Sequence, residues 1–383
     1  MNDSHERKLL ERVCRLPKEL EPMRELLLAN VVMISEIPAP TFAEEKRISF
    51  IKQRFTECGL SSVSTDEAGN GMGLLPGTVG DRTLLLVAHA DTPFSSSDNH
   101  TCTVEPSIIR GPGVADNSLG VAVLASLPTL LDRLGLQLQC DLLLMASTQS
   151  LEQGDQQGLR YFLQNYGRRI SCGMLIEGSP LGRLQYRSMA SLGGMITCRV
   201  HNKTSQANAI ELLNRVISQL GMIALPEWPQ TALVLGSISG GASYKMPARN
   251  ARLRFQLRSD SDDVVREVTE QISTVCEQLG EEEGVTAELE VIARATAGGL
   301  VAGHPLVSQT CRVLEALKIQ PRKVIQSSTV SACVEQNIPA ICIGISNGDN
   351  INYYDEYVEI DPILTGVAQL IGVLLSMDGG CCA

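Results

Sequence analysis

Residues 84–91 read LLLVAHAD, an apolar run that ends in His89 and Asp91. A continuous run of leucine and valine of this length predicts a strand buried on both faces of a parallel sheet. Such strands carry functional side chains at their carboxyl ends, where His89 and Asp91 stand. Because alternate strand residues point to the same side, one of the two can bind a metal ion while the other orients it. By itself the pattern is more typical of a structural histidine. The choice between a structural histidine and a metal ligand therefore depends on the rest of the chain.

Three further acidic residues lie at the ends of predicted elements. Asp116 follows a glycine-containing loop at the entry of a long apolar helix, where it also fits a simple N-cap. The apolar stretch 140–148 ends shortly before Glu152, and the stretch 173–180 contains Glu177 at the end of its apolar part. One histidine and three carboxylates at strand ends favour a site for zinc or a similar divalent ion.

In order and spacing, the chain resembles the zinc-dependent exopeptidase and deacylase superfamily, which includes peptidase T, carboxypeptidase G and the aminoacylases. The resemblance extends from about Ile34 to Leu375. Its motifs are EIPAPTFAEE (36–45), DEAGNGMGLLPG (66–77), HADT (89–92), GPGVADNSLG (111–120), ISGG (238–241) and YYDEYVEI (353–360).

The resemblance implies the residues of a metal centre. By position, His89, Asp116 and Glu177 would hold one zinc or similar ion, and Asp91 would orient His89. Asp116 and Glu152 would contribute to a second ion. A small peptide or N-acyl amino acid would be the substrate.

The position of the catalytic base departs from the family pattern. The family has Thr-x-x-Glu-Glu-x-Gly after the third strand, where the first glutamate is the general base and the second binds metal. Here residues 148–154 read TQSLEQG, which puts Leu151 at the base position. A shift of register would make Glu152 the base, but it would leave Gln153 as the ligand and change the spacing to Gly154. Leucine cannot accept a proton, so the base would have to be Glu152, if the second ion is absent, or a residue from elsewhere in the chain.

The C-terminal histidine ligand of the family is also missing. Asn352 takes its place after the strand 340–346. No histidine follows position 304, since the five are His5, His89, His100, His201 and His304. An asparagine carbonyl is a weak zinc ligand, so we expect one metal ion per chain and a second site that is weak or absent. Asp355 stays open as a replacement ligand.

The middle of the chain predicts a second domain. Residues 189–295 alternate as strand, helix, strand, strand, helix and strand, which is typical of a ferredoxin-like unit. In the family this unit is the lid or dimerisation domain, so the resemblance implies a homodimer formed through it. Ser259–Asp262 offers an N-cap for the second helix.

The lid residues of the family are only partly matched. Arg258 matches a family arginine and would bind a substrate carboxylate, although an ion pair on the surface fits it nearly as well. The loop 201–206 is short, and His201 lies earlier than the histidine that stabilises the oxyanion in the family. Tyr244 stands where an asparagine precedes the lid proline, here Pro247.

Composition excludes several other classes. A chain of 383 residues with 44% apolar residues fits two globular domains. A formal net charge of −11 argues against nucleic acid and anionic membranes as partners. No apolar run looks long enough to span a bilayer, and the N-terminal residues lack a signal-peptide core. The twelve cysteines have no CxxC spacing, which predicts reduced thiols of a cytoplasmic protein with Cys381 and Cys382 exposed.

We therefore predict a catalytic-type α/β domain formed by residues 1–187 and 296–383. Its mixed, mostly parallel sheet is flanked by helices, and a ferredoxin-like lid of residues 188–295 is inserted. Two functions follow. The first is a metallohydrolase that cleaves amide bonds in small peptides or N-acyl amino acids. The second is a catalytically impaired relative, altered at Leu151 and Asn352, that acts as a binding or structural protein.

Overall fold

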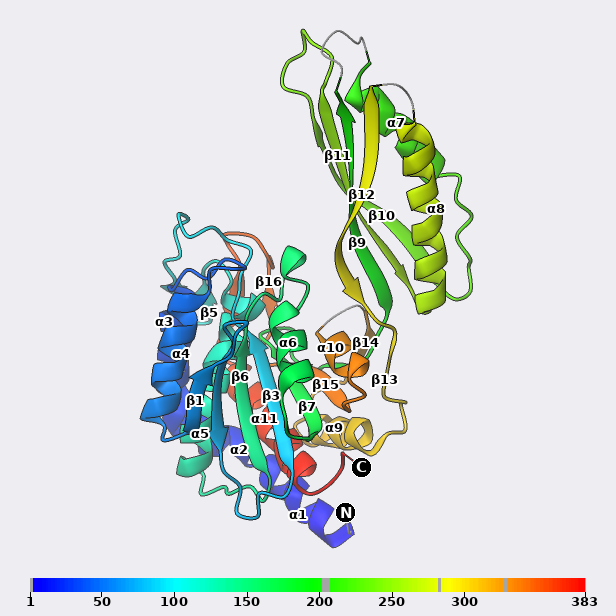
Figure 1. Ribbon diagram of the computed structural model, residues 1–383. Coiled ribbons are helices and arrows are strands. Elements are labelled where there is room, and N and C mark those ends of the chain that lie inside the picture. Colours follow the sequence, from blue (N-terminus) through cyan, green and yellow to red (C-terminus); the bar gives the residue numbers. More distant parts are fainter. Residues whose placement is uncertain (1–2, 202–206, 282–283, 327–328, 383) are drawn as a thin grey trace. The chain divides into compact units, whose positions relative to one another are not determined.

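The chain forms two compact units, residues 1–187 with 299–383 and residues 188–298 (Figure 1). The structure is a computed structural model that describes residues 3–201, 207–281, 284–326 and 329–382. The larger unit contains a mixed sheet with parallel central strands, and the smaller unit contains a separate antiparallel sheet. The predicted fold class is therefore confirmed.

The larger unit is built on a nine-stranded sheet. Its strands follow the spatial order β1 (Ser61–Thr65), β2 (Gly71–Leu75), β6 (Asp141–Ser147), β3 (Thr83–His89), β7 (Ile170–Glu177), β15 (Ala340–Gly344), β8 (Arg183–Ser188) and β13 (Gly298–Gly299), with β14 (Arg322–Ile325) beside β8. Strand β3 is parallel to β6 and β7, and β7 is parallel to β15. The carboxyl ends of these strands therefore share one edge of the sheet.

The apolar run 84–91 forms β3 and the loop after it, and every residue of β3 is buried, as predicted. Leu84 and Leu86 belong to the core on one face of the sheet, and Leu85 and Val87 to the core on the other. Helices contribute to both cores. The first core contains residues of α1 (Asp3–Val13), α2 (Leu16–Leu20), α3 (Arg24–Ser35), α4 (Glu45–Glu57), α5 (Leu119–Arg133), α9 (Pro305–Ala316) and α11 (Ile363–Asp378), and the second contains residues of α6 (Gln157–Asn165) and α10 (Val330–Glu335).

A small second sheet in the larger unit joins two loops that are distant in the sequence. Its strands are β16 (Gly348–Asp349), β17 (Tyr357–Glu359), β5 (Ile108–Arg110) and β4 (Thr103–Val104). Antiparallel pairing of β17 with β5 places Val358 opposite Ile109. This sheet holds the loop that leads to Asp116 next to the segment that contains Asn352.

One helical segment corrects an expectation from the sequence. Within the described residues, Val114–Arg133 is long and apolar enough to cross a membrane by length and composition. However, 89% of its most apolar window is buried inside the protein, and α5 packs against β3 and β7. A core helix meets the same criteria, so this segment gives no support for a membrane location.

The smaller unit has the predicted βαββαβ order (Figure 1). Its elements are β9 (Ala190–Val200), α7 (Ala209–Leu220), β10 (Thr231–Gly240), β11 (Asn250–Ser259), α8 (Asp262–Gly280) and β12 (Val285–Ala295). The antiparallel sheet has the order β10-β11-β9-β12 and shares an apolar core with α7 and α8. The hydroxyl of Ser261 caps α8 by accepting the N–H of Val264 at 3.5 Å, within the predicted capping segment.

The cysteines differ from the prediction in one pair. Cys172 in β7 and Cys382 form a disulfide across a sequence separation of 210 residues, so not all thiols are free. Cys381 and Cys382 are 8% and 9% exposed, because both pack into the first core. The prediction of an exposed C-terminal pair is therefore wrong.

A buried arginine fixes the loop that follows β3. Arg47 in α4 has no exposed surface. Its guanidinium donates to the carbonyl oxygens of Ile37 at 2.6 Å and Ala90 at 2.9 Å. Burial lowers the pKa of Arg47 to about 10, which still leaves it charged at neutral pH. Since Ala90 lies between His89 and Asp91, Arg47 holds the backbone that carries both.

We predict that Arg47→Met lowers the free energy of unfolding by at least about 2 kcal/mol, because it leaves buried carbonyl groups unpaired. Urea unfolding followed by far-UV circular dichroism measures this change. The matched control is Lys46→Met, an exposed neighbour on the same helix, which should change stability by less than about 0.5 kcal/mol. Equal effects of the two substitutions would show that the Arg47 hydrogen bonds do not stabilise the fold.

Candidate metal centre

Three predicted ligands meet at the shared edge of the parallel strands. His89 is the last residue of β3 and Glu177 the last of β7, while Asp116 lies in the short helical segment η2 (Val114–Ser118) before α5. One ligand atom from each lies within 4.8 Å of the other two. His89 Nε2 is 2.9 Å from Asp116 Oδ1 and 3.6 Å from Glu177 Oε2. An imidazole nitrogen and two carboxylate oxygens fit one zinc or similar divalent ion.

Asp91 holds His89 from the opposite side of the ring. His89 Nδ1 lies 3.2 Å from the backbone carbonyl oxygen of Asp91 and 3.4 Å from its Oδ1. This arrangement leaves Nε2 directed at the two acids, which is the orientation that a metal ligand needs. Burial alone would lower the pKa of His89, but hydrogen bonds to Asp116, Asp91 and Glu177 outweigh it and raise this pKa well above its usual value.

The three ligands line a cavity of about 350 Å³ within the larger unit. Its other lining residues are Ala115, Ser150, Leu151, Gln156, Ser179, Pro180, Arg183, Gln326, Thr329 and Ile351. A volume of this size suits a small molecule. Leu151, the residue at the predicted base position, therefore lies in the wall of the same cavity as the metal ligands.

Glu152 does not join the three ligands. It is exposed in the short helical turn η3 (Glu152–Gly154), and the group of potential metal ligands among the described residues does not include it. Glu152 lines a separate cavity of about 240 Å³ together with Phe42 and Thr92, and Leu151 lines both this cavity and the metal cavity. Its backbone has a φ of 42°, a left-handed conformation that follows Leu151 directly. The local turn therefore brings the leucine, and not the glutamate, to the metal cavity.

Asn352 and Asp355 also lie outside the group of three ligands. Asn352 is exposed with a φ of 68°, and its neighbour Ile351 is the residue that lines the cavity. Asp355 is exposed and accepts a hydrogen bond from Asn350. The replacement of the missing histidine by Asp355, which the sequence left open, has no support in this geometry.

The predicted lid residues belong to the smaller unit. Arg258 is exposed on β11, and Tyr244 is 93% exposed. His201 Nε2 lies 3.0 Å from the hydroxyl of Thr286 on β12. The rest of the short loop, residues 202–206, lies outside the described residues.

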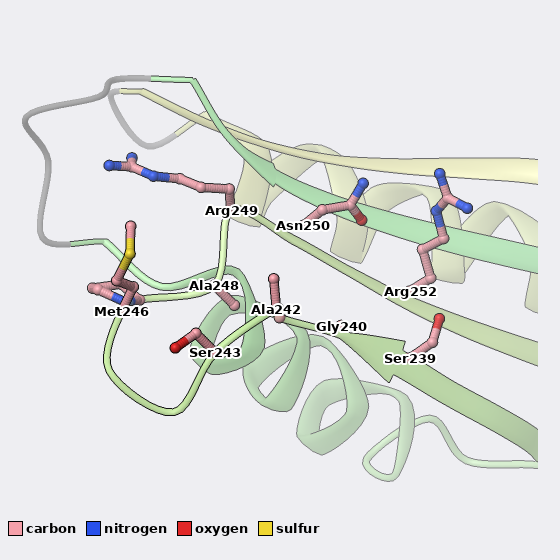
Figure 2. A pocket seen from close by; sticks show the side chains of 11 residues that line it. Ser239, Gly240, Ala242, Ser243, Met246, Ala248, Arg249, Asn250 and Arg252 are labelled. Atoms are coloured by element: carbon pink, nitrogen blue, oxygen red, sulfur yellow. The ribbon is translucent and has the colours of Figure 1, made fainter.

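The smaller unit also has a cavity of its own, of about 460 Å³. It is lined by residues 239–243, which include the glycines of the ISGG motif, and by residues 246–250 and Arg252. Figure 2 shows Met246 and Arg249 at one end and Arg252 at the other. No predicted metal ligand lines this cavity.

Glu356 is a part of the site that the sequence analysis missed. Its side chain is fully buried, and its Oε1 accepts the backbone N–H groups of Ala115 at 2.6 Å and Asp116 at 2.7 Å. Its Oε2 accepts the N–H of Asn352 at 3.0 Å. One carboxylate thus fixes the backbone of a metal ligand to the segment of the missing histidine.

A signal for Glu356 was present in the motif YYDEYVEI. Glu356, Val358 and Ile360 alternate along an extended segment, and all three are buried. An acid on the apolar side of such a segment predicts a structural carboxylate that needs donors. Two of those donors, the N–H groups of Ala115 and Asp116, are more than two hundred positions away, so their identity required the structure.

Comparison with known proteins identifies the fold of this chain. Residues 190–284 match the family model of the M20 peptidase dimerisation domain. The larger unit carries the candidate metal site at the carboxyl ends of its parallel strands. The chain therefore has the fold of the M20 metallopeptidases, and the resemblance inferred from the motifs is confirmed.

Three solved structures illustrate this likeness. Aminopeptidase PepT of Bacillus cereus is 16% identical, with a TM-score of 0.71 and coverage of 92% of this chain and 98% of its own. A dipeptidase of Saccharomyces cerevisiae is 12% identical, with a TM-score of 0.77 and coverage of 97% and 99%. A dinuclear metal-binding M20 peptidase of Bacillus subtilis is 14% identical, with a TM-score of 0.65 and coverage of 93% and 98%. At these identities the likeness is one of fold. No curated protein sequence matches the chain.

Glu356 gives the metal-free protein a testable pH dependence. Burial raises the pKa of Glu356 from its ordinary value of 4.5 to about 7, despite the backbone donors. The folded form therefore holds the proton more tightly than the unfolded form, and this contribution to stability is lost as pH rises from about 5 to 7.

In the wild-type protein, Glu356 lowers the free energy of unfolding by up to about 1.4 kcal/mol for each unit by which the pH rises in this range. We predict that Glu356→Gln, which cannot ionise, removes this part of the pH dependence. Urea unfolding at pH 5, 6 and 7 measures it. Glu45→Gln, at an exposed position in α4, should keep the wild-type slope. A wild-type slope in Glu356→Gln would mean that Glu356 is ionised throughout this range.

Proposed function

We propose that this protein binds one divalent metal ion through His89, Asp116 and Glu177. We further propose that it acts on the amide bond of a small peptide or N-acyl amino acid, with turnover limited by the missing base. The observation that carries the proposal is the convergence of these three ligands on the wall of a cavity of about 350 Å³. When bound, zinc or a similar ion supplies Lewis-acid polarisation of the amide carbonyl.

The residues around this ion have different proposed roles. Asp91 orients His89 through Nδ1 and leaves Nε2 for the metal. Glu356 fixes the backbone of Asp116. Leu151 occupies the wall where a proton acceptor is expected, so general-base assistance is lost at this position. Such assistance is typically worth about 10²–10⁴-fold in rate, and Glu152 can supply it only if its loop rearranges.

The alternative is a non-catalytic protein that binds small ligands at the same site. Its support is the combination of Leu151 inside the metal cavity and Glu152 outside it. Both functions use the same ligands, and they differ only in turnover. Metal content and hydrolysis measured together separate them.

We also propose a separate role for each of the two domains. Residues 1–187 and 296–383 form the catalytic-type domain, and residues 188–295 form a lid that pairs two chains into a homodimer. The match of residues 190–284 to a dimerisation domain supports this pairing. Arg258 is proposed to contact a substrate carboxylate from the lid, and the location is proposed to be cytoplasmic.

The first test is metal analysis of the purified protein by mass spectrometry, together with a hydrolysis screen of dipeptides and N-acetyl amino acids. We expect one metal ion per chain and slow turnover. One ion without turnover would favour the binding protein. Two ions with rapid turnover, or no ion after dialysis against zinc, would contradict the proposed one-metal site.

His89→Ala should abolish metal retention, because it removes the only nitrogen ligand among the three. Asn352→Ala should change the metal content little, because Asn352 lies outside the ligand group. The readout is metal content after gel filtration, with unfolding curves to show that both variants fold. An equal loss in the two variants would refute a site limited to His89, Asp116 and Glu177.

Restoring the two altered positions gives a second prediction. Leu151→Glu supplies a proton acceptor, and Asn352→His supplies a second nitrogen ligand. Because groups that act as a unit are strongly non-additive, the double variant should exceed the product of the two single effects on kcat/KM. Apolar surroundings would raise the pKa of the new glutamate by desolvation, so rates are measured from pH 6 to 9. A double variant that binds two ions without any gain in rate would place the defect elsewhere.

A further inference from the structure

Arg183 gives the metal cavity a positive charge that the proposed chemistry has not used. Among the described residues that line the cavity, it is the only arginine or lysine. The acids in this lining are the metal ligands Asp116 and Glu177. The cavity therefore has an acidic metal-binding part and one permanent cation, and this asymmetry can orient a ligand.

The charge of Arg183 is not neutralised by the protein. Within the described part of the chain, no carboxylate lies within ion-pair distance of its guanidinium, and its buried Nε has no hydrogen-bond acceptor. Its Nη2 donates only to the neutral amide oxygen of Gln185 at 3.2 Å. By contrast, Arg160 in the same unit pairs with Asp155 at 2.8 Å and with Glu335 at 3.1 Å.

Gln185 holds Arg183 in a defined position without using its charge. Gln185 is fully buried in β8. Its Nε2 donates to the carbonyl oxygens of Gln326 at 2.6 Å and Arg187 at 3.1 Å, which fixes its Oε1 toward Arg183. Strand β8 itself lies between β15 and β14 in the sheet. A cation fixed in this way loses little further conformational entropy when it binds an anion.

We propose that Arg183 is a substrate-binding residue that donates hydrogen bonds to a carboxylate, in addition to the contact proposed for Arg258, so that the site selects small amide-linked molecules with a free carboxylate. The proposal rests on the proposed function, which places the amide bond of the substrate at His89, Asp116 and Glu177. A planar guanidinium pairs with a carboxylate through two N–H donors, and Arg183 has donors to spare. The acids Asp116 and Glu177 repel the carboxylate from their own side of the cavity until metal neutralises them.

The test is binding, not turnover. The probes are N-methanesulfonyl derivatives of alanine, leucine and lysine, each as the free acid and as the primary amide, since the sulfonamide bond resists amide hydrolases. Isothermal titration of the zinc-saturated full chain gives the Kd of each probe, and the zinc content of every variant is measured. We expect the acid of at least one pair to bind about 10- to 100-fold more tightly than its amide.

Arg183→Gln should abolish this preference for the acid, and Arg183→Lys should keep part of it. The matched control is Arg187→Gln, an exposed arginine of the same strand that does not line the cavity and should behave as wild type. Far-UV circular dichroism shows whether each variant folds, and the wild-type comparison of acid with amide needs no variant. A wild-type protein without preference for any acid overturns the proposal, and so does an equal loss in the Arg183 and Arg187 variants.

The outcomes also separate this inference from the proposed function. Preference for the acid without any hydrolysis of peptides or N-acetyl amino acids supports Arg183 and contradicts the hydrolase. Hydrolysis without preference for the acid supports the hydrolase and contradicts Arg183.

Discussion

The carboxylate of Asp91 is fully buried, and its two oxygens hold different parts of the centre. Its Oδ1 lies 3.4 Å from His89 Nδ1, and its Oδ2 accepts from the hydroxyl of Thr41 and the N–H groups of Ser150 and Leu151 at 2.8–2.9 Å. A buried charge is stable only when such donors surround it. The orientation of the metal ligand and the path of the loop after β6 therefore depend on one side chain.

This dependence shows that the loop after β6 is held by backbone groups, whichever side chain stands at position 151. The hydrogen bonds from residues 150 and 151 to Asp91 are made by backbone N–H groups, so the side chain at 151 does not contribute to them. Glu44 holds the preceding residue in the same manner by accepting the N–H of Gln149 at 2.8 Å. A leucine at 151 is thus compatible with the loop.

The candidate metal ligands His89, Asp116 and Glu177 and the cation Arg183 belong to the larger unit. The proposed binding of a metal ion and the proposed binding of a carboxylate therefore use residues of the same unit. The smaller unit places Arg252 and Arg258 on exposed alternate positions of β11, with its apolar residues directed to α7 and α8. The part that the smaller unit plays in substrate binding depends on the proposed role of Arg258 and on the proposed pairing between chains.

The sequence by itself determined the buried strand that ends in His89, the acids at positions 116 and 177, and the βαββαβ unit, because apolar runs and periodicity are local. The tertiary structure decided which side chains face the metal cavity. Leu151 faces it and Glu152 does not, because the turn between them adopts a left-handed φ at Glu152. The donors of Glu356, the neutral partner of Arg183 and the Cys172–Cys382 disulfide also required the structure. Glu356 and the disulfide join segments far apart in the chain, and the amide of Gln185 that holds Arg183 also donates to the carbonyl oxygen of Gln326, which is 141 positions away. Sequence patterns do not encode these contacts.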